Sequence, residues 1–213
     1  MYFCNMKKIV FIMNPISGTS NKAGIPDLIE KTLDHEQFSF DLYETEYAGH
    51  ASELATKAKE EGADIVVAIG GDGTVNEIAR TIVHSKTALG IVPCGSGNGL
   101  ARHLMLPMNM RKAIEILNHC EIHELDYGLI NGHPFFCTCG MGFDAFVSQK
   151  FAESGKRGPI SYVENVLREG LNTNPRHMTS RTSLAPSAPK HSSFPAQMPH
   201  NTATTPTLPR RHP

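Results

Sequence analysis

The stretch Ile65-Val66-Val67-Ala68-Ile69-Gly70-Gly71-Asp72-Gly73-Thr74-Val75-Asn76-Glu77 joins an apolar run to a glycine-rich turn. An unbroken run of five apolar residues is typical of a parallel strand that is covered on both faces. The two glycines end this strand, and helical spacing of apolar residues resumes at Asn76. The stretch therefore predicts a strand, a tight turn and a helix, the repeating unit of an α/β fold.

The same alternation extends outward in both directions. Three more strands are expected at Lys8–Met13, Phe38–Thr45 and Ala88–Val92. Helices are expected at Pro26–Leu33, His50–Glu61, Asn76–His84 and Arg111–Asn118. Strands that alternate with helices at this spacing predict a three-layer α/β domain with a mostly parallel sheet. We assign residues 5–120 to this domain.

The pattern changes after residue 120. Ile122–Ile130 and Pro134–Cys139 flank the pair Asn131-Gly132, the strongest short-range signal for a β-hairpin. Tyr162–Glu169 then shows helical spacing. We therefore expect an incomplete, β-rich second domain over residues 121–171.

The composition changes again at residue 172. Residues 172–213 contain no Gly, Asp or Glu, yet they hold 8 of the 14 prolines. So few aliphatic side chains cannot bury enough surface to offset the entropy cost of ordering the chain. We expect a disordered, Pro/Ser/Thr-rich tail over residues 172–213, and interpret the chain as truncated where this tail begins.

The bulk composition excludes several classes of protein. The 20 basic and 21 acidic residues nearly balance, which argues against a protein that coats nucleic acid. No apolar stretch approaches the roughly 18 residues of a membrane span. Five cysteines without a C-x-x-C pair indicate reduced thiols in a cytoplasmic protein. Cys137 and Cys139 are expected to be buried small hydrophobic residues rather than metal ligands.

Three glycine clusters follow predicted strands, at Asn14–Gly18, Gly70–Glu77 and Pro93–Arg102. Open α/β sheets bind ligands at such strand ends. Glycine lets the backbone come close to an anion, and a helix N-terminus attracts phosphate. For the first cluster alone a plain turn explains the sequence equally well. The second and third together exceed what turning the chain requires, which favours a phosphate-binding site.

Asp72 does not suit a pure anion cradle, because a carboxylate repels phosphate. It suits a site that also holds a metal ion or a transferring group. No P-loop motif is present, and Asn76 occupies the place of the third glycine of a dinucleotide-binding fingerprint. The segment Gly140-x-Gly142-x-x-Ala145 matches the looser form of that fingerprint, but it lacks the strand–helix–strand context.

The motif GGDGTVNE (Gly70–Glu77), with N-P-x-S-G upstream and P-x-G-S-G-N-x-L-A-R downstream, resembles the catalytic domain of diacylglycerol kinases. That family includes bacterial soluble lipid kinases and is related to the sphingosine kinases. The resemblance runs from about Lys7 to Gly170. It implies a nucleotide-binding α/β domain of the NAD kinase and phosphofructokinase type, followed by the start of a β-sandwich domain, with the active site between them.

The resemblance also implies roles for individual residues. Asp72 and Asp126 match active-site acids that would hold Mg²⁺ or orient water and hydroxyl groups. Asp144, in a G-x-G-F-D-A segment, would face the lipid substrate. His50 matches the T-x-x-x-x-H-A element that begins at Thr45 beside the nucleotide. ATP would lie along Asn14, Ser17, Gly18, Thr45, Gly70, Gly71, Asp72, Gly73, Thr74, Val75, Asn76 and Ser96. The metal ligands themselves stay unassigned.

Two features depart from the family pattern. Many bacterial members carry Asp where this chain has Gly99, which leaves the acceptor lipid open. The general base of the family is a glutamate late in the second domain. No glutamate follows Glu169 in this chain, so the base has no counterpart to carry over.

The expected function is an ATP-dependent lipid kinase of phospholipid metabolism. It would transfer the γ-phosphate to the hydroxyl of diacylglycerol or a similar lipid alcohol, with Mg²⁺. Its partner would be the lipid at the inner membrane surface, where a cytoplasmic protein binds peripherally without a membrane span. No nucleic-acid partner is expected, and a homodimer stays open. The alternatives are an inactive nucleotide-binding fragment and a soluble-substrate kinase of the NAD kinase type, since GGDGT also occurs in NAD kinases and 6-phosphofructokinases.

Overall fold

The structure, a computed structural model, describes residues 6–18, 22–119, 121–140, 145 and 193–198. Strands and helices alternate in its first part, as β1 (Lys7–Met13), α1 (Ile25–Thr32), β2 (Phe38–Glu44), α2 (His50–Glu60), β3 (Ile65–Gly70), α3 (Asp72–Ile82), β4 (Ala88–Pro93), α4 (Gly99–His103) and α5 (Met110–Leu117). Strands alone make up the rest, namely β5 (Glu121–Asp126), β6 (Gly128–Ile130), β7 (His133–Phe135) and β8 (Ser193–Met198).

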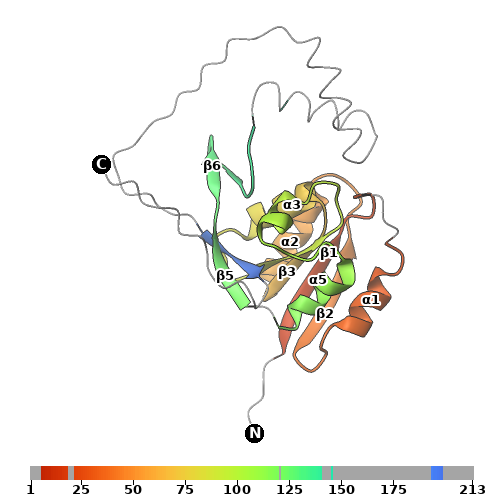
Figure 1. Cartoon of the computed structure of the whole chain (residues 1–213). Helices are drawn as coiled ribbons and strands as arrows, with labels where there is room; N and C mark the ends of the chain where they lie inside the picture. The colour runs from red at the N-terminus through yellow and green to blue at the C-terminus, as the bar shows by residue number, and fades with distance from the viewer. Residues whose placement is uncertain (1–5, 19–21, 120, 141–144, 146–192, 199–213) are drawn as a thin grey trace, which may run out of the picture.

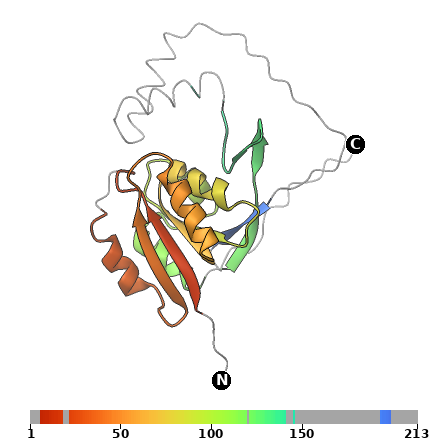
Figure 2. The same cartoon turned by 180° about the vertical axis from the view of Figure 1, so that it is seen from behind.

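Strands β2, β1, β3 and β4 lie parallel, in that order, in one sheet. Each connection between them passes through a helix, as crossovers between parallel strands usually do. Helices α2 and α3 cover one face of the sheet, and α1 and α5 cover the other (Figures 1 and 2). The predicted three-layer α/β fold with a parallel sheet is confirmed.

Strand β1 shows why the central strands are apolar throughout. Ile9, Phe11 and Met13 pack toward α1 and α5, whereas Val10 and Ile12 pack toward α2 and α3. Successive side chains of a strand point to opposite faces, so a strand covered on both faces has no position for a polar residue. All five side chains are buried. Each full burial of such a side chain stabilises the fold by about 1.5–3 kcal/mol.

Helix α3 begins four residues earlier than the sequence pattern predicts. Gly71 has an extended backbone, with φ −99° and ψ −170°, and the helix starts at Asp72. The N–H of Val75 already donates to the carbonyl of Gly71 at 3.1 Å. The glycine-rich segment after β3 is therefore a very short turn that leads straight into a helix N-terminus.

The predicted hairpin at Asn131-Gly132 is confirmed as β6 and β7, with Ile130 opposite His133. Asn131 has φ 51° and Gly132 has φ 80°, the two positive values that a type I′ turn requires. The sequence pattern predicts that the first hairpin strand begins at Ile122, but in the structure it begins at Gly128. The preceding segment is the separate strand β5, which belongs to the larger sheet.

Strand β8 forms within the range 172–213, where the sequence predicts disorder. It lies between β4 and β5, parallel to β4 and antiparallel to β5. All six residues of β5 pair with β8, whereas β4 pairs with β8 at one position, Leu89 opposite Ala196. The edge of a strand offers unpaired backbone donors and acceptors. Because these bond to the backbone of a neighbouring strand, a segment with few aliphatic side chains can also pair there. The rest of that range and the predicted helix Tyr162–Glu169 lie outside the described residues.

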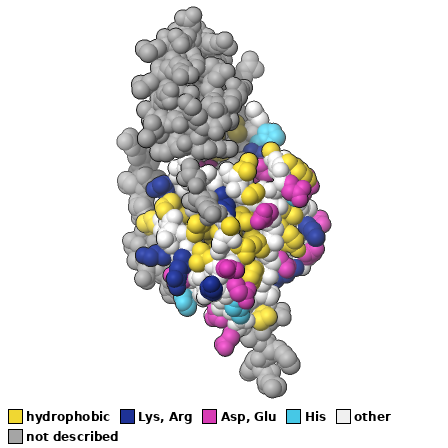
Figure 3. Space-filling view, turned by 90° about the vertical axis from the view of Figure 1, so that its right-hand side faces the viewer, with side chains coloured by type: hydrophobic (Ala, Val, Ile, Leu, Met, Phe, Trp, Pro, Cys, Tyr) yellow, Lys and Arg dark blue, Asp and Glu magenta, His cyan; other side chains and the backbone are white. Residues whose placement is uncertain are grey.

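Within the described ranges, no helix combines the length and the apolar character that crossing a bilayer requires. On the face shown in Figure 3, basic and acidic side chains both surround exposed hydrophobic surface. Neither sign dominates this face, in keeping with the near-neutral composition of the chain.

Candidate active site

The three glycine-rich loops meet at the carboxyl edge of the sheet, where β1, β3 and β4 end beside one another. The N–H of Asn14 donates to the carbonyl of Ile69 at 3.0 Å, and the N–H of Cys94 donates to the carbonyl of Gly70 at 2.8 Å. The chain leaves β1 toward β2 on one side and returns as β3 on the other. Open α/β sheets bind their ligands at such a reversal of strand order.

Asn14 organises the first loop. Its side-chain Oδ1 accepts a hydrogen bond from the N–H of Ile16 at 3.1 Å, and its carbonyl accepts from the hydroxyl of Ser17 at 3.1 Å. Its Nδ2 donates to the hydroxyl of Thr74 at 3.3 Å. Asn14 therefore links the loop after β1 to the first turn of α3.

The loops approach so closely that only glycine fits at their contacts. Gly18 has φ 63°, and a Cβ at that position would lie 1.9 Å from the carbonyl oxygen of Cys94. A Cβ on Gly95 would lie 2.5 Å from the Cα of Gly71. Real Cβ atoms do not come this close to backbone atoms, so these glycines are required for the loops to share one edge.

Asp72 is the first residue of α3, and its side chain is exposed. Its Oδ1 accepts a hydrogen bond from the N–H of Gly99 at 2.6 Å. A Cβ on Gly97 would lie 2.7 Å from the Oδ2 of Asp72, so the carboxylate rests against the third loop. This contact fixes the direction of the carboxylate while leaving it accessible to a ligand.

Asn98 closes the third loop on itself. Its side chain accepts from the N–H of Gly95 at 2.8 Å and donates to the carbonyl of Gly95 at 2.7 Å. The residue is only 7% exposed and has a left-handed backbone with φ 56°, a conformation that asparagine tolerates. The loop before α4 is thereby held in one shape, and the short helix α4 itself was not expected from the sequence.

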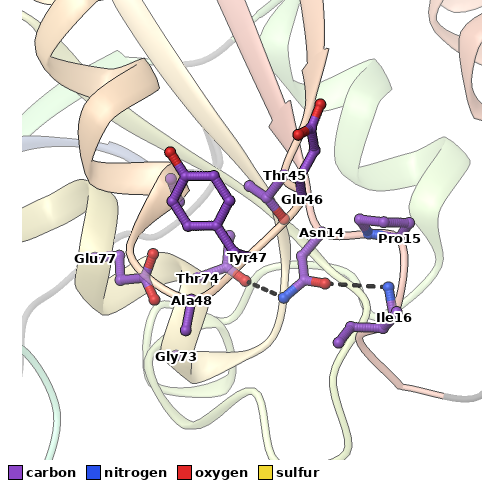
Figure 4. Close-up of a pocket in the computed structure, with 11 residues that line it drawn as sticks. Asn14, Pro15, Ile16, Thr45, Glu46, Tyr47, Ala48, Gly73, Thr74 and Glu77 are labelled. Atoms are coloured by element: carbon purple, nitrogen blue, oxygen red, sulfur yellow. Dashed lines mark hydrogen bonds between the residues drawn. The ribbon is translucent and has the colours of Figure 1, made fainter.

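Two adjacent cavities lie at this edge, and we call the pair the groove. The first, which we call the glycine cavity, has a volume of about 260 Å³ and is lined by Asn14, Ile16, Ser17, Gly18, Gly71, Asp72, Gly73, Thr74, Gly95, Ser96 and Gly97. The second, the Tyr47 cavity, has a volume of about 230 Å³ and is lined by Asn14, Pro15, Ile16, Thr45, Glu46, Tyr47, Ala48, Ala51, Gly73, Thr74 and Glu77 (Figure 4). Asn14, Ile16, Gly73 and Thr74 line both cavities and so lie where they join.

A buried lysine lies beneath the first loop. Lys22 is 6% exposed, and its ammonium donates to the carbonyls of Pro15 and Ser17. Burial lowers the pKa of Lys22, and the nearby Cys94 offsets part of this shift. Burial raises the pKa of the Cys94 thiol, and Lys22 offsets part of that shift. The ammonium thus contributes both hydrogen bonds and positive charge beneath the first loop.

Cys137 and Asp72 both lie on the Cβ side of Gly99, close to each other. A Cβ on Gly99 would lie 3.1 Å from the Sγ of Cys137 and 3.6 Å from the Oδ1 of Asp72. Burial, and then the charge of Asp72, raise the pKa of the Cys137 thiol. Both Cys137 and Cys139 are exposed, so the prediction that they are buried small residues is wrong. The sequence alternation after β7 does not form a covered strand there.

The structure brings most of the predicted nucleotide-binding residues to this groove. Nine of them line one or both cavities, namely Asn14, Ser17, Gly18, Thr45, Gly71, Asp72, Gly73, Thr74 and Ser96. Gly70 and Val75 are buried and Asn76 is half-buried, and these three line neither cavity. They shape the turn and anchor α3 in the core.

The two other predicted acids lie elsewhere. Asp126 is exposed at the end of β5 and lines neither of the two cavities. Asp144 lies outside the described residues, so its predicted place on the lipid side stays a prediction. His50 begins α2 next to the groove, and its Nδ1 accepts a hydrogen bond from the N–H of Glu46 at 3.1 Å.

Sequence reasoning missed several residues of the groove. Tyr47 and Ile16 give it exposed apolar surface, and Glu46 and Glu77 add two carboxylates to that of Asp72. Tyr47 lies between Thr45 and His50 in the T-x-x-x-x-H-A element, and Glu77 is the last residue of GGDGTVNE. Their positions within these two motifs could have marked both residues as part of the site. Nothing in the sequence marks Lys22, because its approach to the first loop depends on how the chain folds back after Gly18.

The part of the chain that the structure describes holds no group of three His, Cys, Asp or Glu residues suited to a metal ion. Asp72 is the acid that lines the glycine cavity. One carboxylate is a donor set that suits Mg²⁺ when phosphate oxygens and water supply the remaining ligands.

Comparison with known proteins identifies the family of this chain. A family-level sequence comparison matches residues 8–130 to the diacylglycerol kinase catalytic domain. A diacylglycerol kinase of Staphylococcus saprophyticus is 32% identical over 161 residues, which are 73% of this chain and 52% of that protein. A diacylglycerol kinase of Staphylococcus aureus is 30% identical over 161 residues, 73% of this chain and 51% of that protein. The chain thus spans about half the length of these relatives.

Among solved structures, a diacylglycerol kinase from Bacillus anthracis str. Sterne has a TM-score of 0.53 and 24% sequence identity. The match covers 62% of this chain and 48% of that one, and it shows the shared NAD kinase-like fold. The shared fold and a sequence match over more than half of the residues agree. The chain belongs to the diacylglycerol kinase catalytic domain family.

Proposed function

We propose that this chain provides the nucleotide-binding domain of an ATP-dependent lipid kinase that phosphorylates the hydroxyl of diacylglycerol or a similar lipid alcohol. The observation that carries the proposal is the pair of adjacent cavities at the strand-order reversal, one of them lined by the glycine loops with an oriented Asp72 among them. The name diacylglycerol kinase borne by the relatives supports the lipid as acceptor.

The glycine cavity suits a polyphosphate. Gly18, Gly71 and Gly95 leave backbone exposed at its wall, and Thr74 and Ser96 add hydroxyl donors. The N-terminus of α3, which begins at Asp72, adds free N–H groups and a partial positive charge. Such fixed donors would position the phosphates and stabilise the charge that spreads over them during transfer.

Asp72 would hold Mg²⁺ together with phosphate oxygens. Its Oδ1 is engaged by the N–H of Gly99, so Oδ2 is the atom we assign to the ion or to its bound water. A bound Mg²⁺ would neutralise phosphate charge and remove the repulsion between Asp72 and the nucleotide.

In the proposed reaction the lipid hydroxyl oxygen attacks the γ-phosphorus of ATP. A new oxygen–phosphorus bond forms, the bond between the γ-phosphorus and the β,γ-bridging oxygen breaks, ADP leaves, and the hydroxyl proton passes to a base. Alignment of the two substrates in the groove would supply much of the rate gain. Because the acceptor is a lipid, we propose that the reaction takes place at the inner membrane surface.

The test is a transfer assay with γ-labelled ATP, Mg²⁺ and micellar diacylglycerol, sphingosine or soluble NAD. We expect label in the lipid extract. Labelled NADP would instead indicate a soluble-substrate kinase. Saturable ATP binding without labelled product would indicate that the chain binds nucleotide but does not transfer phosphate. This is a separate outcome because the chain spans only about half the length of its relatives.

Asp72→Asn tests the role of the carboxylate. Asparagine keeps an oxygen that can accept the N–H of Gly99, so the fold should persist while the charge is lost. We expect transfer to fall about a hundredfold or more, by analogy with the loss of one electrostatic group from an active site. Asp27→Asn, in the first turn of α1 and away from the groove, is the matched control. Unchanged transfer in Asp72→Asn would show that this assignment is wrong.

A further inference from the structure

The loop between α4 and α5 presents apolar side chains to solvent. We call residues 104–109 the Met105 loop. Met105 is 66% exposed and Met108 is 37% exposed. Leu104 and Leu106, on either side of Met105, are both buried. The two leucines anchor the loop in the core, so the exposed methionines are held at the surface by a fixed backbone.

The backbone of Met105 is left-handed, with φ 56°. The N–H of Met105 donates to the carbonyl of Arg102 at 3.0 Å. The N–H of Leu106 donates to the carbonyl of Ala101 at 2.9 Å. These two bonds form the Schellman motif that commonly ends a helix, and its left-handed position is usually glycine. A side chain with a Cβ destabilises the fold at such a position.

Helix α2 ends in the same motif. The N–H of Gly62 donates to the carbonyl of Lys59 at 3.1 Å. The N–H of Ala63 donates to the carbonyl of Ala58 at 2.9 Å. Here the left-handed residue is Gly62, with φ 79°. The chain therefore uses the favoured residue at one helix end and an exposed methionine at the other. Because neither the backbone nor the core accounts for Met105, its side chain points to a role outside the fold.

The charges that flank the Met105 loop are basic. Exposed cations lie on both sides of it, namely Arg102, Arg111 and Lys112. No Asp or Glu occurs between Glu77 and Glu115, although acidic residues outnumber basic ones over residues 1–171. Arg111 pairs with Glu115 at 3.6 Å, whereas Lys112 has no ion pair within the described residues. Apolar side chains between cations match an anionic bilayer, whose headgroup region accepts the former and whose lipids attract the latter.

Helix α4 connects the Met105 loop to the candidate active site. The helix begins at Gly99, whose N–H donates to the Oδ1 of Asp72 at 2.6 Å. Its five residues span about 7.5 Å. The Nε of Arg102 donates to the carbonyl of Gly97 in the third glycine-rich loop at 2.9 Å. A lipid surface bound at the Met105 loop would therefore lie close to Asp72.

We propose that the Met105 loop binds the surface of an anionic lipid bilayer. Met105 and Met108 enter the headgroup region, and Arg102, Arg111 and Lys112 lie against the lipid anions. This inference deepens the proposed function and rests on it, because it names the surface by which the chain reaches its lipid acceptor.

The test measures binding of the full chain to vesicles in the absence of nucleotide. Sedimentation with sucrose-loaded vesicles compares phosphatidylcholine alone with an equal mixture of phosphatidylcholine and phosphatidylglycerol. We expect binding to the mixed vesicles to be about tenfold tighter or more, since each cation near an anionic surface adds to the affinity. Raising the NaCl concentration should weaken this binding, because salt screens the attraction.

Met105→Gly and Met105→Asn remove the apolar side chain while keeping a residue that accepts a left-handed backbone. Urea unfolding should therefore show no loss of stability in Met105→Gly. We expect both variants to bind mixed vesicles roughly three- to tenfold more weakly, because binding scales with the apolar area that enters the interface.

Lys112→Gln tests the same surface without a change at Met105, and we expect its vesicle affinity to fall about fivefold. Two variants elsewhere are matched controls. Leu129→Ser removes an exposed apolar side chain on β6, and Lys57→Gln removes an exposed cation on α2, across the sheet from α5. Both should bind vesicles as the wild type does.

Wild-type affinity for mixed vesicles in both Met105 variants or in Lys112→Gln would overturn the proposal, as would a wild-type chain that does not bind these vesicles. Equal binding to the two kinds of vesicle would overturn the anionic partner. A dimer that forms without vesicles and that both Met105 variants dissociate would overturn the proposal in favour of a second copy of the chain. Failure of phosphate transfer to a soluble short-chain diacylglycerol, with vesicle binding intact, would count against the proposed function alone.

Discussion

Gly18 ends the first loop where the backbone has positive φ and passes directly over the carbonyl of Cys94. Gly62 has a similar φ of 79°, but nothing lies within 4 Å of where its Cβ would be. Substitution of either glycine by alanine would place a side chain on a left-handed backbone. Only at Gly18 would the new Cβ also clash with another loop of the groove. Comparison of the two positions therefore separates the energetic cost of the backbone conformation from that of the clash.

We predict that Gly62→Ala lowers the free energy of unfolding by about 1–2 kcal/mol, the usual cost of a left-handed residue with a Cβ. Gly18→Ala should cost more than Gly62→Ala, because the new Cβ would lie 1.9 Å from a backbone oxygen. Urea unfolding followed by circular dichroism measures both values. Equal losses for the two variants would contradict the close approach of the first and third loops.

Cys94 and Lys22 predict a pH dependence of stability. Burial raises the pKa of the Cys94 thiol above its ordinary value of 9.0, so at alkaline pH the unfolded chain releases this proton before the folded chain does. The folded state then binds more protons, and the thiol makes stability fall as pH rises above about 8.5. The lowered pKa of Lys22 acts in the opposite direction, because its folded state releases the proton first.

Cys94→Ala removes the contribution of the Cys94 thiol to the pH dependence of stability and keeps that of Lys22. Between pH 8 and pH 10, we predict that its free energy of unfolding has a more positive slope against pH than that of the wild type. Urea unfolding at four pH values gives both slopes, so the cavity left by the substitution, which shifts stability at every pH, does not interfere. Parallel slopes would mean that the thiol ionises as readily in the folded chain as in the unfolded one.

At the scale of elements, α5 offers a test that is independent of the groove. The side chain of Asn109 caps this helix by accepting a hydrogen bond from the N–H of Lys112 at 3.1 Å. The helix packs its buried residues Ala113, Ile114 and Leu117 against the face of the sheet that α1 also covers. Neither Asn109 nor these residues line the two cavities.

We predict that Asn109→Ala lowers the free energy of unfolding by about 1 kcal/mol and leaves ATP affinity unchanged. Asn109→Asp keeps a capping oxygen and should stay within a few tenths of a kcal/mol of wild type. Thermal unfolding and calorimetry give the two readouts. A parallel fall in ATP affinity in Asn109→Ala would show that α5 and the groove are coupled.

At the scale of the whole molecule, β8 joins two parts of the chain that are distant in sequence. Every residue of β5 pairs with β8, and β8 in turn meets β4 at Leu89. The position of β5 beside the central sheet therefore depends on a segment more than sixty residues further along the chain. The core strands β1 and β3 pair only with each other and with their parallel neighbours.

We predict that Ala196→Pro, which removes an N–H in the middle of β8, speeds amide hydrogen exchange in β5 severalfold while leaving β1 and β3 protected. Exchange measured by mass spectrometry on the full chain compares these strands in one sample, so β1 and β3 act as the internal control. Unchanged exchange in β5 would contradict its pairing with β8.

The sequence alone predicts much of this molecule. Short runs such as Ile65–Ile69 determine the central strands, because a strand covered on both faces must be apolar throughout. Glycine clusters after the strands indicate the loops, and Asn131-Gly132 determines its hairpin, since local backbone conformation decides both. These features depend on residues that are neighbours in the chain.

Only the tertiary structure decides what depends on distant neighbours. It brings Cys137 beside Asp72 and pairs β8 with β5. None of these contacts leaves a periodic signal, because each joins segments whose spacing is set by the folded backbone. The sequence thus determined an α/β domain with a glycine-lined ligand edge, and the folded chain decided that two adjacent cavities share this edge.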